Sequence, residues 1–284
     1  MKLNGENNIA AHPNSRLHIG DVRNCEILSY YYKSGNKEVK ESLKEHIESG
    51  LKLIENISES RLMRAGVKIC EDFQNLLKMS FVFHDIGKVF YQRNFRKRNG
   101  TEYLSFRGHE YFSAYILDSC LIELIKEGVE ENVWNSMTFS VLYHHHAMTL
   151  SLRWPRVSEY SIELGFEKLK SLRNVLNEIW GKSNLGSVIE FKIVERTLDN
   201  LSKLVDGIGN DGCKQFQAEV RRVVDDEIDN KLWLEFATDP KLRKLYLLSL
   251  QSLVAVDYKA SFRRGGGRGA FQRVIDEFWK LYAR

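Results

Sequence analysis

The chain has 284 residues, 43% of them hydrophobic and 28% charged, with a formal net charge of +4. This length and apolar content suffice for a sizeable core, so we expect one large domain over residues 1–284, with or without a subdomain. No apolar run reaches the length of a membrane span and the N-terminus carries no signal-peptide core, which excludes a membrane protein and favours a cytoplasmic one.

Residue usage favours an all-α fold. Three prolines and long stretches of Leu, Glu and Lys are typical of a mostly helical protein. Four cysteines stand singly, with no CxxC pair, which excludes a zinc ribbon and a disulfide framework. The mild positive charge permits a polyanionic partner without requiring one.

Four helices are predicted in the first half of the chain, after a polar N-terminal arm. Residues 36–57 have the apolar periodicity of an amphipathic helix, with His46 on the apolar face. The next helices are expected at residues 68–84, 108–128 and 132–148. We expect these segments to pack into a helical bundle.

The second half of the chain divides into an irregular part and a strongly apolar part. Residues 150–240 contain two or three charged helices broken at glycine-containing stretches, and we expect a helical insertion or subdomain there. Residues 240–261 return to an apolar helix that carries Asp257 on its apolar face. A glycine-rich stretch, RRGGGRG, then precedes a final amphipathic helix at 270–284.

Histidine and aspartate interrupt the apolar face of each of the five apolar helices. A single such residue is more often a hydrogen-bonded core residue than a ligand, and three adjacent histidines can be accidental. If the helices pack side by side, however, their imidazole nitrogens and carboxylate oxygens meet at one point, and these atoms bind Zn, Mn, Ni, Co, Fe and Mg. The residues are His46, His84, Asp85, His109, the run His144, His145 and His146, and Asp257.

A metal centre of this kind has a known chemistry. Two metal ions bridged by one carboxylate hydrolyse phosphoesters, because they activate water and neutralise charge on the phosphate. No Ser/His/Asp arrangement stands out in the sequence, and this chemistry needs no serine or cysteine nucleophile. The pattern therefore predicts a phosphoester hydrolase.

Five short stretches carry a resemblance to a known family. They are HDIGK at 84–88, LKEHIESG around His46, GHEYFSA around His109, YHHHA at 143–147 and VDYKAS at 256–261. With them the chain resembles the HD superfamily of metal-dependent phosphohydrolases. Within that superfamily it is similar to the stand-alone HD nuclease of type I CRISPR systems. The resemblance covers about residues 40–150 and 245–262, and it leaves residues 150–240 without a matching motif.

The resemblance implies two divalent metal ions, Mg, Mn, Ni, Co or Zn, at two sites that share Asp85. One site would use His46, His84, Asp85 and Asp257. The other would use Asp85, His109 and two of the adjacent histidines. The HHHA stretch favours His144 and His145 for this role, with His146 as a replacement for either one. Lys88 would lie near the metals and contact a phosphate oxygen, so Asp85 and Lys88 are the expected catalytic residues.

Basic residues follow three of the predicted ligand positions, with Arg153 and Arg156 after the histidine run as one of these clusters. They favour a rim that binds a single-stranded polyanion, with nearby aromatic residues for base stacking. The alternative is that they complement helix dipoles and stay solvated. The predicted nucleic-acid-binding residues are Arg93, Arg96, Lys97 and Arg98 after the His-Asp pair, and Arg263, Arg264 and Arg268 after Asp257.

The resemblance implies a nuclease that cleaves single-stranded DNA, with RNA as an alternative, in type I CRISPR interference. Its implied partners are a separate helicase and an RNA-guided surveillance complex, and no membrane. Two other functions stay open. The chain could be an HD phosphohydrolase acting on nucleotides or cyclic nucleotides, or a helical module that binds nucleic acid without catalysis.

Overall fold

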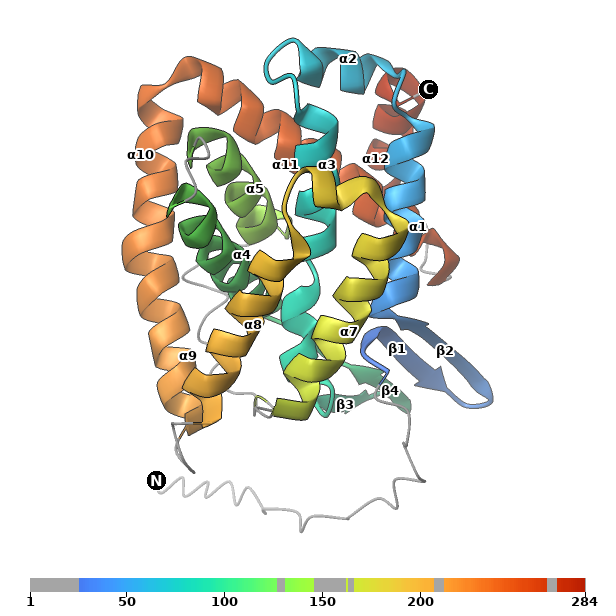
Figure 1. Cartoon of the computed structure of the whole chain (residues 1–284). Helices are drawn as coiled ribbons and strands as arrows, with labels where there is room; N and C mark the ends of the chain where they lie inside the picture. Colours follow the sequence, from blue (N-terminus) through green and yellow to red (C-terminus); the bar gives the residue numbers. More distant parts are fainter. Residues whose placement is uncertain are drawn as a thin grey trace, which may run out of the picture.

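The computed structural model describes residues 26–126, 131–145, 162, 166–206, 212–264 and 270–283, and helices dominate it (Figure 1). The predicted all-α fold class is confirmed, with a small sheet as the one addition. Within the described ranges, no helix combines the length and the apolar content needed to cross a membrane.

Five helices form the central bundle. They pack against one another in several pairs, and α5 and α11 make the most extensive of these contacts. The helices are α1 (Leu43–Asn56), α3 (Phe73–Phe83), α4 (His109–Lys126), α5 (Glu131–Tyr143) and α11 (Pro240–Ala260). Their apolar side chains form one buried core, so the predicted bundle is present.

Helix α1 begins later than the sequence pattern predicts. The Ser42 hydroxyl accepts a hydrogen bond from the Glu45 backbone N–H at 3.1 Å, and the Glu45 carboxylate accepts one from the Ser42 backbone N–H at 2.9 Å. This reciprocal pair is a capping box, which fixes the start of a helix. The prediction of helix over residues 36–42 is therefore wrong, because Lys37–Ser42 form a strand instead.

A four-stranded antiparallel sheet lies beside α1 at one end of the bundle (Figure 1). Its strand order is β2-β1-β4-β3, with β1 at Leu28–Ser34, β2 at Lys37–Ser42, β3 at Phe95–Arg98 and β4 at Thr101–Leu104. Sequence analysis missed this sheet.

The two hairpins of the sheet turn at residues with positive φ. Gly35 has φ +55°, Asn99 has φ +51° and Gly100 has φ +73°. The Asn99-Gly100 pair is a strong hairpin signal, so the second hairpin was detectable in the sequence.

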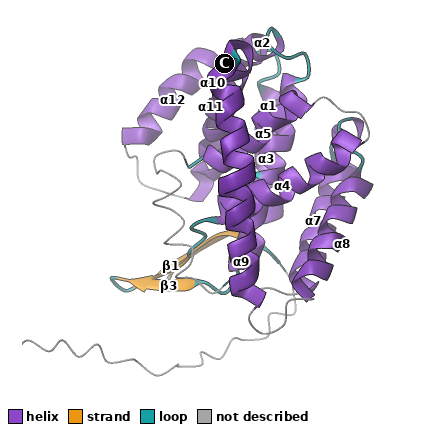
Figure 2. Cartoon of the chain, turned by 90° about the vertical axis from the view of Figure 1, so that its left-hand side faces the viewer, coloured by secondary structure: helices purple, strands orange, loops and turns teal. Residues whose placement is uncertain are grey.

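Residues of the expected insertion fold onto the bundle. They form α7 (Phe166–Lys182), α8 (Phe191–Asp206), α9 (Gly212–Arg222) and α10 (Asn230–Thr238). A π-helical segment, Val223–Asp229, joins α9 to α10, and the resulting long helix crosses the front of the molecule in Figure 2.

The aromatic side chain of Phe216 ties this segment to the bundle. Its ring centroid lies 5.6 Å from that of Phe90 and 5.7 Å from that of Phe112. All three side chains are at most 1% exposed. The apolar residues of α7 to α10 therefore belong to the same core as the central bundle.

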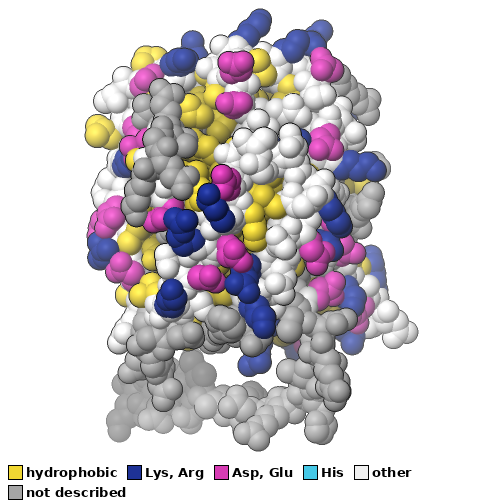
Figure 3. Space-filling view, in the orientation of Figure 1, with side chains coloured by type: hydrophobic (Ala, Val, Ile, Leu, Met, Phe, Trp, Pro, Cys, Tyr) yellow, Lys and Arg dark blue, Asp and Glu magenta, His cyan; other side chains and the backbone are white. Residues whose placement is uncertain are grey.

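Five smaller elements complete the described chain, and two of them are the short 3₁₀ helices η2 (Asn184–Ser187) and η4 (Ser261–Arg264). Helix α2 (Arg61–Val67) precedes α3, so the helix expected at 68–84 begins only at Phe73. The 3₁₀ helix η1 (Ile86–Tyr91) follows α3, and α12 (Ala270–Tyr282) packs on α11. Acidic and basic side chains are interspersed on the face shown in Figure 3, and no described histidine is visible there.

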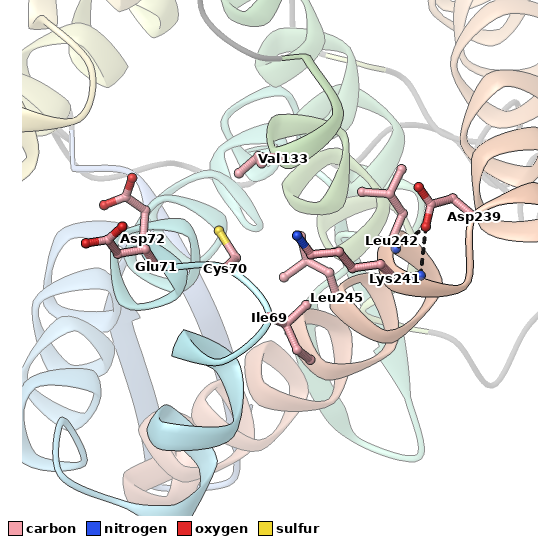
Figure 4. Close-up of a pocket in the computed structure, with 9 residues that line it drawn as sticks. All are labelled: Ile69, Cys70, Glu71, Asp72, Val133, Asp239, Lys241, Leu242 and Leu245. Carbon is pink, nitrogen blue, oxygen red and sulfur yellow. Dashed lines mark hydrogen bonds between the residues drawn. The ribbon is translucent and has the colours of Figure 1, made fainter.

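A pocket opens at the N-terminal ends of α5 and α11 (Figure 4). Its lining includes Cys70, Val133 and Leu245. The predicted ligand Asp257 follows Leu245 by twelve residues on α11, and His144, directly after α5, follows Val133 by eleven. At about 1.5 Å of rise per residue, that separation is roughly 17 Å. This pocket is therefore distinct from the predicted metal site.

Gly50 on α1 provides a test of core packing. A Cβ atom at this position would lie 2.0 Å from Cε1 of Phe81, whose side chain is fully buried. We expect Gly50→Ala to lower the free energy of unfolding by about 1–3 kcal/mol, because the ring has no room to retreat. Chemical denaturation of both proteins measures the difference.

Gly181, near the end of α7, is the matched control. Nothing lies within 4 Å of a Cβ atom built there. Gly181→Ala is expected to leave the stability unchanged or raise it by up to about 1 kcal/mol. Equal destabilisation by the two substitutions would contradict the packing argument.

Candidate metal centre

The ends of four helices and the body of a fifth supply the predicted ligands. His84 is the C-cap of α3, and Asp85 is the N-cap of η1. His109 is the first residue of α4, and His144 and His145 directly follow α5. The remaining two, His46 and Asp257, lie within α1 and in the last turn of α11. The structure brings all seven together.

The first group consists of His46, His84, Asp85 and Asp257. Ligand atoms of the first three lie within 4.8 Å of one another. Oδ2 of Asp85 is 3.5 Å from Nε2 of both histidines. Oδ1 of Asp257 is 3.2 Å from Nε2 of His46 and 3.6 Å from Nε2 of His84. Two nitrogens and two carboxylates thus face a common point.

The second group consists of His109, His144 and His145, whose ligand atoms also lie within 4.8 Å of one another. The other oxygen of Asp85, Oδ1, is 2.9 Å from Nε2 of His109. The two oxygens of this carboxylate therefore face different groups. This is the geometry that one bridging carboxylate between two metal ions requires.

Three of the histidines are oriented by backbone carbonyl groups. In each case Nδ1 lies 2.6–2.7 Å from the carbonyl oxygen three residues earlier, which belongs to Phe81 for His84, Phe106 for His109 and Val141 for His144. Because a carbonyl only accepts, Nδ1 carries the proton in all three rings. The lone pair is then on Nε2, as a metal ligand needs.

The Nε2 atoms provide a test of whether the residues fit a metal. In the described part of the chain, Nε2 of His46, His84, His109 and His144 is buried and makes no hydrogen bond of acceptable geometry. An unsatisfied buried polar atom costs about 1–3 kcal/mol. Four such atoms in one place, next to two carboxylates, fit divalent metal ions better than they fit an ordinary core.

The charges of the site match this interpretation. Burial alone would raise the pKa of Asp85, but the neighbouring His84, Lys88 and His109 outweigh it and hold the pKa well below its usual range. Burial likewise opposes ionisation of Asp257, and hydrogen bonding and charge from His46 and His84 lower its pKa. Both carboxylates are therefore ionised at neutral pH.

His144, in contrast to the two carboxylates, is held in its uncharged form. Burial, reinforced by repulsion from the neighbouring His145, keeps the pKa of His144 well below its usual range. The ring is therefore neutral at neutral pH. Neutral imidazole and ionised carboxylate are the forms that bind metal.

Lys88 lies inside the centre. Its Nζ is 2.5 Å from Oδ2 of Asp85 and 3.3 Å from the backbone oxygen of Ser29. It also lies 5.1 Å from the ring centroid of Phe106. The predicted contact with a phosphate oxygen stays a prediction; in the structure Lys88 donates to the Asp85 carboxylate and to the backbone oxygen of Ser29.

Gly87 and Ser113 position the second group, and sequence analysis missed this role. A Cβ atom at Gly87 would lie 2.1 Å from the backbone oxygen of His109. The Gly87 N–H donates to the Ser113 hydroxyl at 2.9 Å. The glycine in HDIGK therefore lets η1 approach α4 closely enough for Asp85 to reach His109.

The predicted nucleic-acid-binding residues occupy several places. Arg96, Lys97 and Arg98 lie on β3, and Arg93 lies just before it. Arg264 lies beside the metal centre, where it contacts Glu41, Ser29 and His46. Three predicted positions lie outside the described side chains: His146, Arg263 and Arg268.

Two groups of histidines, all buried except His145, face the two oxygens of one carboxylate within five packed helices. This arrangement suits the binding of divalent metal ions that hydrolyse phosphoesters. The model of the HD domain family matches residues 43–169, which hold every predicted ligand except Asp257. This match supports the HD superfamily and, with it, metal-dependent hydrolysis. No curated protein and no solved structure matches the chain.

Replacement of the shared carboxylate tests the two-group geometry. We expect Asp85→Ala to weaken metal binding at both groups by more than about 100-fold, because even outer-shell changes cost 10–100-fold. Titration calorimetry with Mn²⁺ and metal analysis after dialysis measure the loss. The control is Asp199→Ala. Asp199 lies on α8 and forms a surface ion pair with Arg173 of α7. Loss confined to one group would show that Asp85 does not bridge.

Proposed function

We propose that the protein is a divalent-metal-dependent nuclease that hydrolyses phosphodiester bonds of single-stranded DNA, with RNA as a second substrate. The observation that carries the proposal is the carboxylate of Asp85, with one oxygen facing each histidine group. When bound there, two metal ions would activate water and neutralise phosphate charge.

The chain's own residues would supply orientation and charge. The backbone carbonyls fix the rings of three histidines, and the ionised Asp85 and Asp257 add the negative charge that holds cations. Lys88 places a positive charge beside Asp85. From that position its ammonium group supports the negative charge that builds on a phosphate during attack.

The four-stranded sheet favours a polymeric substrate over a free nucleotide. Residues paired across strands share a face, and the pairing sets Val39, Tyr32, Tyr103 and Arg96 in one row across all four strands. All four side chains are partly exposed. Two aromatic rings that can stack with bases therefore lie on one partly exposed face, with the Arg96 side chain beside them.

This face runs toward the metal centre. Tyr30 lies two residues before Tyr32 and so points to the same side of the sheet. The guanidinium of Arg264 lies 5.2 Å from the Tyr30 ring centroid and 2.9 Å from Nδ1 of His46. A strand stacked on Tyr32 and Tyr103 would lead past Tyr30 to the first histidine group.

The cellular role in the proposal comes from the resemblance alone. It is type I CRISPR interference, with a separate helicase and an RNA-guided surveillance complex as partners. The second candidate function is hydrolysis of nucleotides or cyclic nucleotides by the same metal centre. The exposed aromatic side chains of the sheet favour the nuclease. A nucleotidase binds a single base in an enclosed pocket and has no use for an extended stacking surface.

A substrate panel separates the two candidates. Metal-stripped protein receives Mg²⁺, Mn²⁺, Ni²⁺, Co²⁺ or Zn²⁺ in turn, together with labelled single-stranded DNA, RNA, a duplex or free nucleotides. We expect metal-dependent cutting of the single strand, absent from Asp85→Ala, with the nucleotides untouched. Hydrolysis of a nucleotide with the strand left whole would instead identify a small-molecule phosphohydrolase.

The charges of β3 give a second prediction. Replacement of Arg96, Lys97 and Arg98 by Gln is expected to weaken single-strand binding and to lower its salt-dependence slope by about 2, because each lost phosphate contact contributes about 0.7. Fluorescence anisotropy at several salt concentrations, with chelator to prevent cleavage, measures both effects. The same replacement of three surface cations on α7 and α8, Lys182, Lys192 and Arg196, is the control. An unchanged salt-dependence slope would show that the β3 cations do not contact the phosphates of the strand.

A further inference from the structure

His46 differs from the other buried histidines in what orients its ring. His84, His109 and His144 each direct Nδ1 at a backbone carbonyl. His46 lies inside α1, and its Nδ1 faces two side chains of opposite charge. One terminal nitrogen of the Arg264 guanidinium is 2.9 Å away, and Oε2 of Glu41 is 3.5 Å away.

These two side chains also contact each other and Ser29. The Arg264 Nε donates to Oε2 of Glu41 at 2.5 Å, and its terminal nitrogen donates to the Ser29 hydroxyl at 3.1 Å. The side chains of Arg264 and Glu41 are 14% and 13% exposed. Glu41 of β2 and Arg264 of the 3₁₀ segment after α11 therefore meet at one histidine nitrogen, and Ser29 of β1 holds Arg264 there.

The two partners require different protonation of the same ring. A guanidinium only donates hydrogen bonds, so with Arg264 on Nδ1 the neutral ring must carry its proton on Nε2. A carboxylate only accepts, so with Glu41 on Nδ1 the proton is on Nδ1 and the lone pair is on Nε2. Only the second arrangement lets His46 bind a metal through Nε2, the atom that faces Asp85 and Asp257.

We propose that Glu41 and Arg264 are positioning residues that act on metal binding in opposite directions. Glu41 holds His46 in the tautomer that binds metal, and Arg264 holds the tautomer that does not. Metal binding at the first group therefore requires Arg264 to leave Nδ1. This inference rests on the metal centre of the proposed function and is independent of which phosphoester is cleaved.

Arg264 has room for this movement. It lines an open groove together with Lys40, Glu45 and Glu48. In the proposed movement, the terminal nitrogen turns toward this groove and gives up the Ser29 hydroxyl, while Nε keeps its hydrogen bond to Glu41. The Glu41 carboxylate is then the nearest described side-chain acceptor for a proton on Nδ1.

Two substitutions separate this inference from a general structural role. With Mn²⁺ as the probe, we expect Arg264→Met to tighten binding at the first group by about tenfold and Glu41→Gln to weaken it by about 10–100-fold. The second group, which does not touch either residue, should keep its affinity. Titration calorimetry resolves the two groups, and thermal unfolding confirms that each variant is folded.

Arg196→Met and Glu123→Gln form the matched control pair. These residues make an ion pair of 3.2 Å between α8 and α4, away from the centre. Both control variants are expected to bind Mn²⁺ as the unmodified protein does. Weaker binding in both Arg264→Met and Glu41→Gln would show that the pair only supports the local fold, and would overturn the proposal.

Nitrogen-15 NMR of the histidine rings gives a readout that needs no variant and no activity. In the metal-free protein, His46 should carry its proton on Nε2, while His84, His109 and His144 carry theirs on Nδ1. In Arg264→Met the His46 proton should move to Nδ1. A proton on Nδ1 of His46 in the unmodified metal-free protein would refute the proposal. Failure to cleave any strand, with these tautomers as expected, would remove only the nuclease function.

Discussion

The buried carboxylate of Asp85 is the group on which the rest of the structure depends. A carboxylate in an apolar interior is unfavourable unless cations or hydrogen-bond donors surround it. Here Lys88 lies 2.5 Å from one oxygen, and His109 lies 2.9 Å from the other. Lys88 reaches Asp85 from three residues further along the chain, but the contact with His109 needs η1 to pass close to α4, which Gly87 permits. The packing of the bundle therefore places a hydrogen-bonding or charged partner beside each oxygen of the Asp85 carboxylate.

Helix ends explain how the histidines reach this carboxylate in a usable form. The last carbonyls of a helix lack an intrahelical partner. His84 and His144 follow α3 and α5, so the carbonyls of Phe81 and Val141 are available to fix their rings. His46 lies within α1, where the backbone carbonyls already accept helical hydrogen bonds. The side chains of Glu41 and Arg264 contact its Nδ1 instead. The position of each histidine along its helix thus decides what controls its proton.

The bundle helices and the convergence of the predicted ligands are predictable from sequence, but the residues that support them are not. Apolar periodicity located the bundle helices, and His84, Asp85 and Asp257 stood out because polar residues interrupted it. The Lys and Glu residues of the strand Lys37–Ser42 are typical of helices, so the sequence pattern predicts a helix there. Only the capping box at Ser42 marks where the helix begins. Glu41 and Arg264 are 223 residues apart in the chain, and no periodicity links residues so distant.

The order of the ligands along the chain bears on synthesis. Four of the five elements of the centre lie before residue 146, but Asp257 lies on α11, beyond α7 to α10. Chains emerge from the ribosome N-terminal end first. A nascent chain therefore holds the complete second histidine group while the first still lacks Asp257. The full centre forms only when α11 packs between α1 and α5, so a partly synthesised or truncated chain is without it.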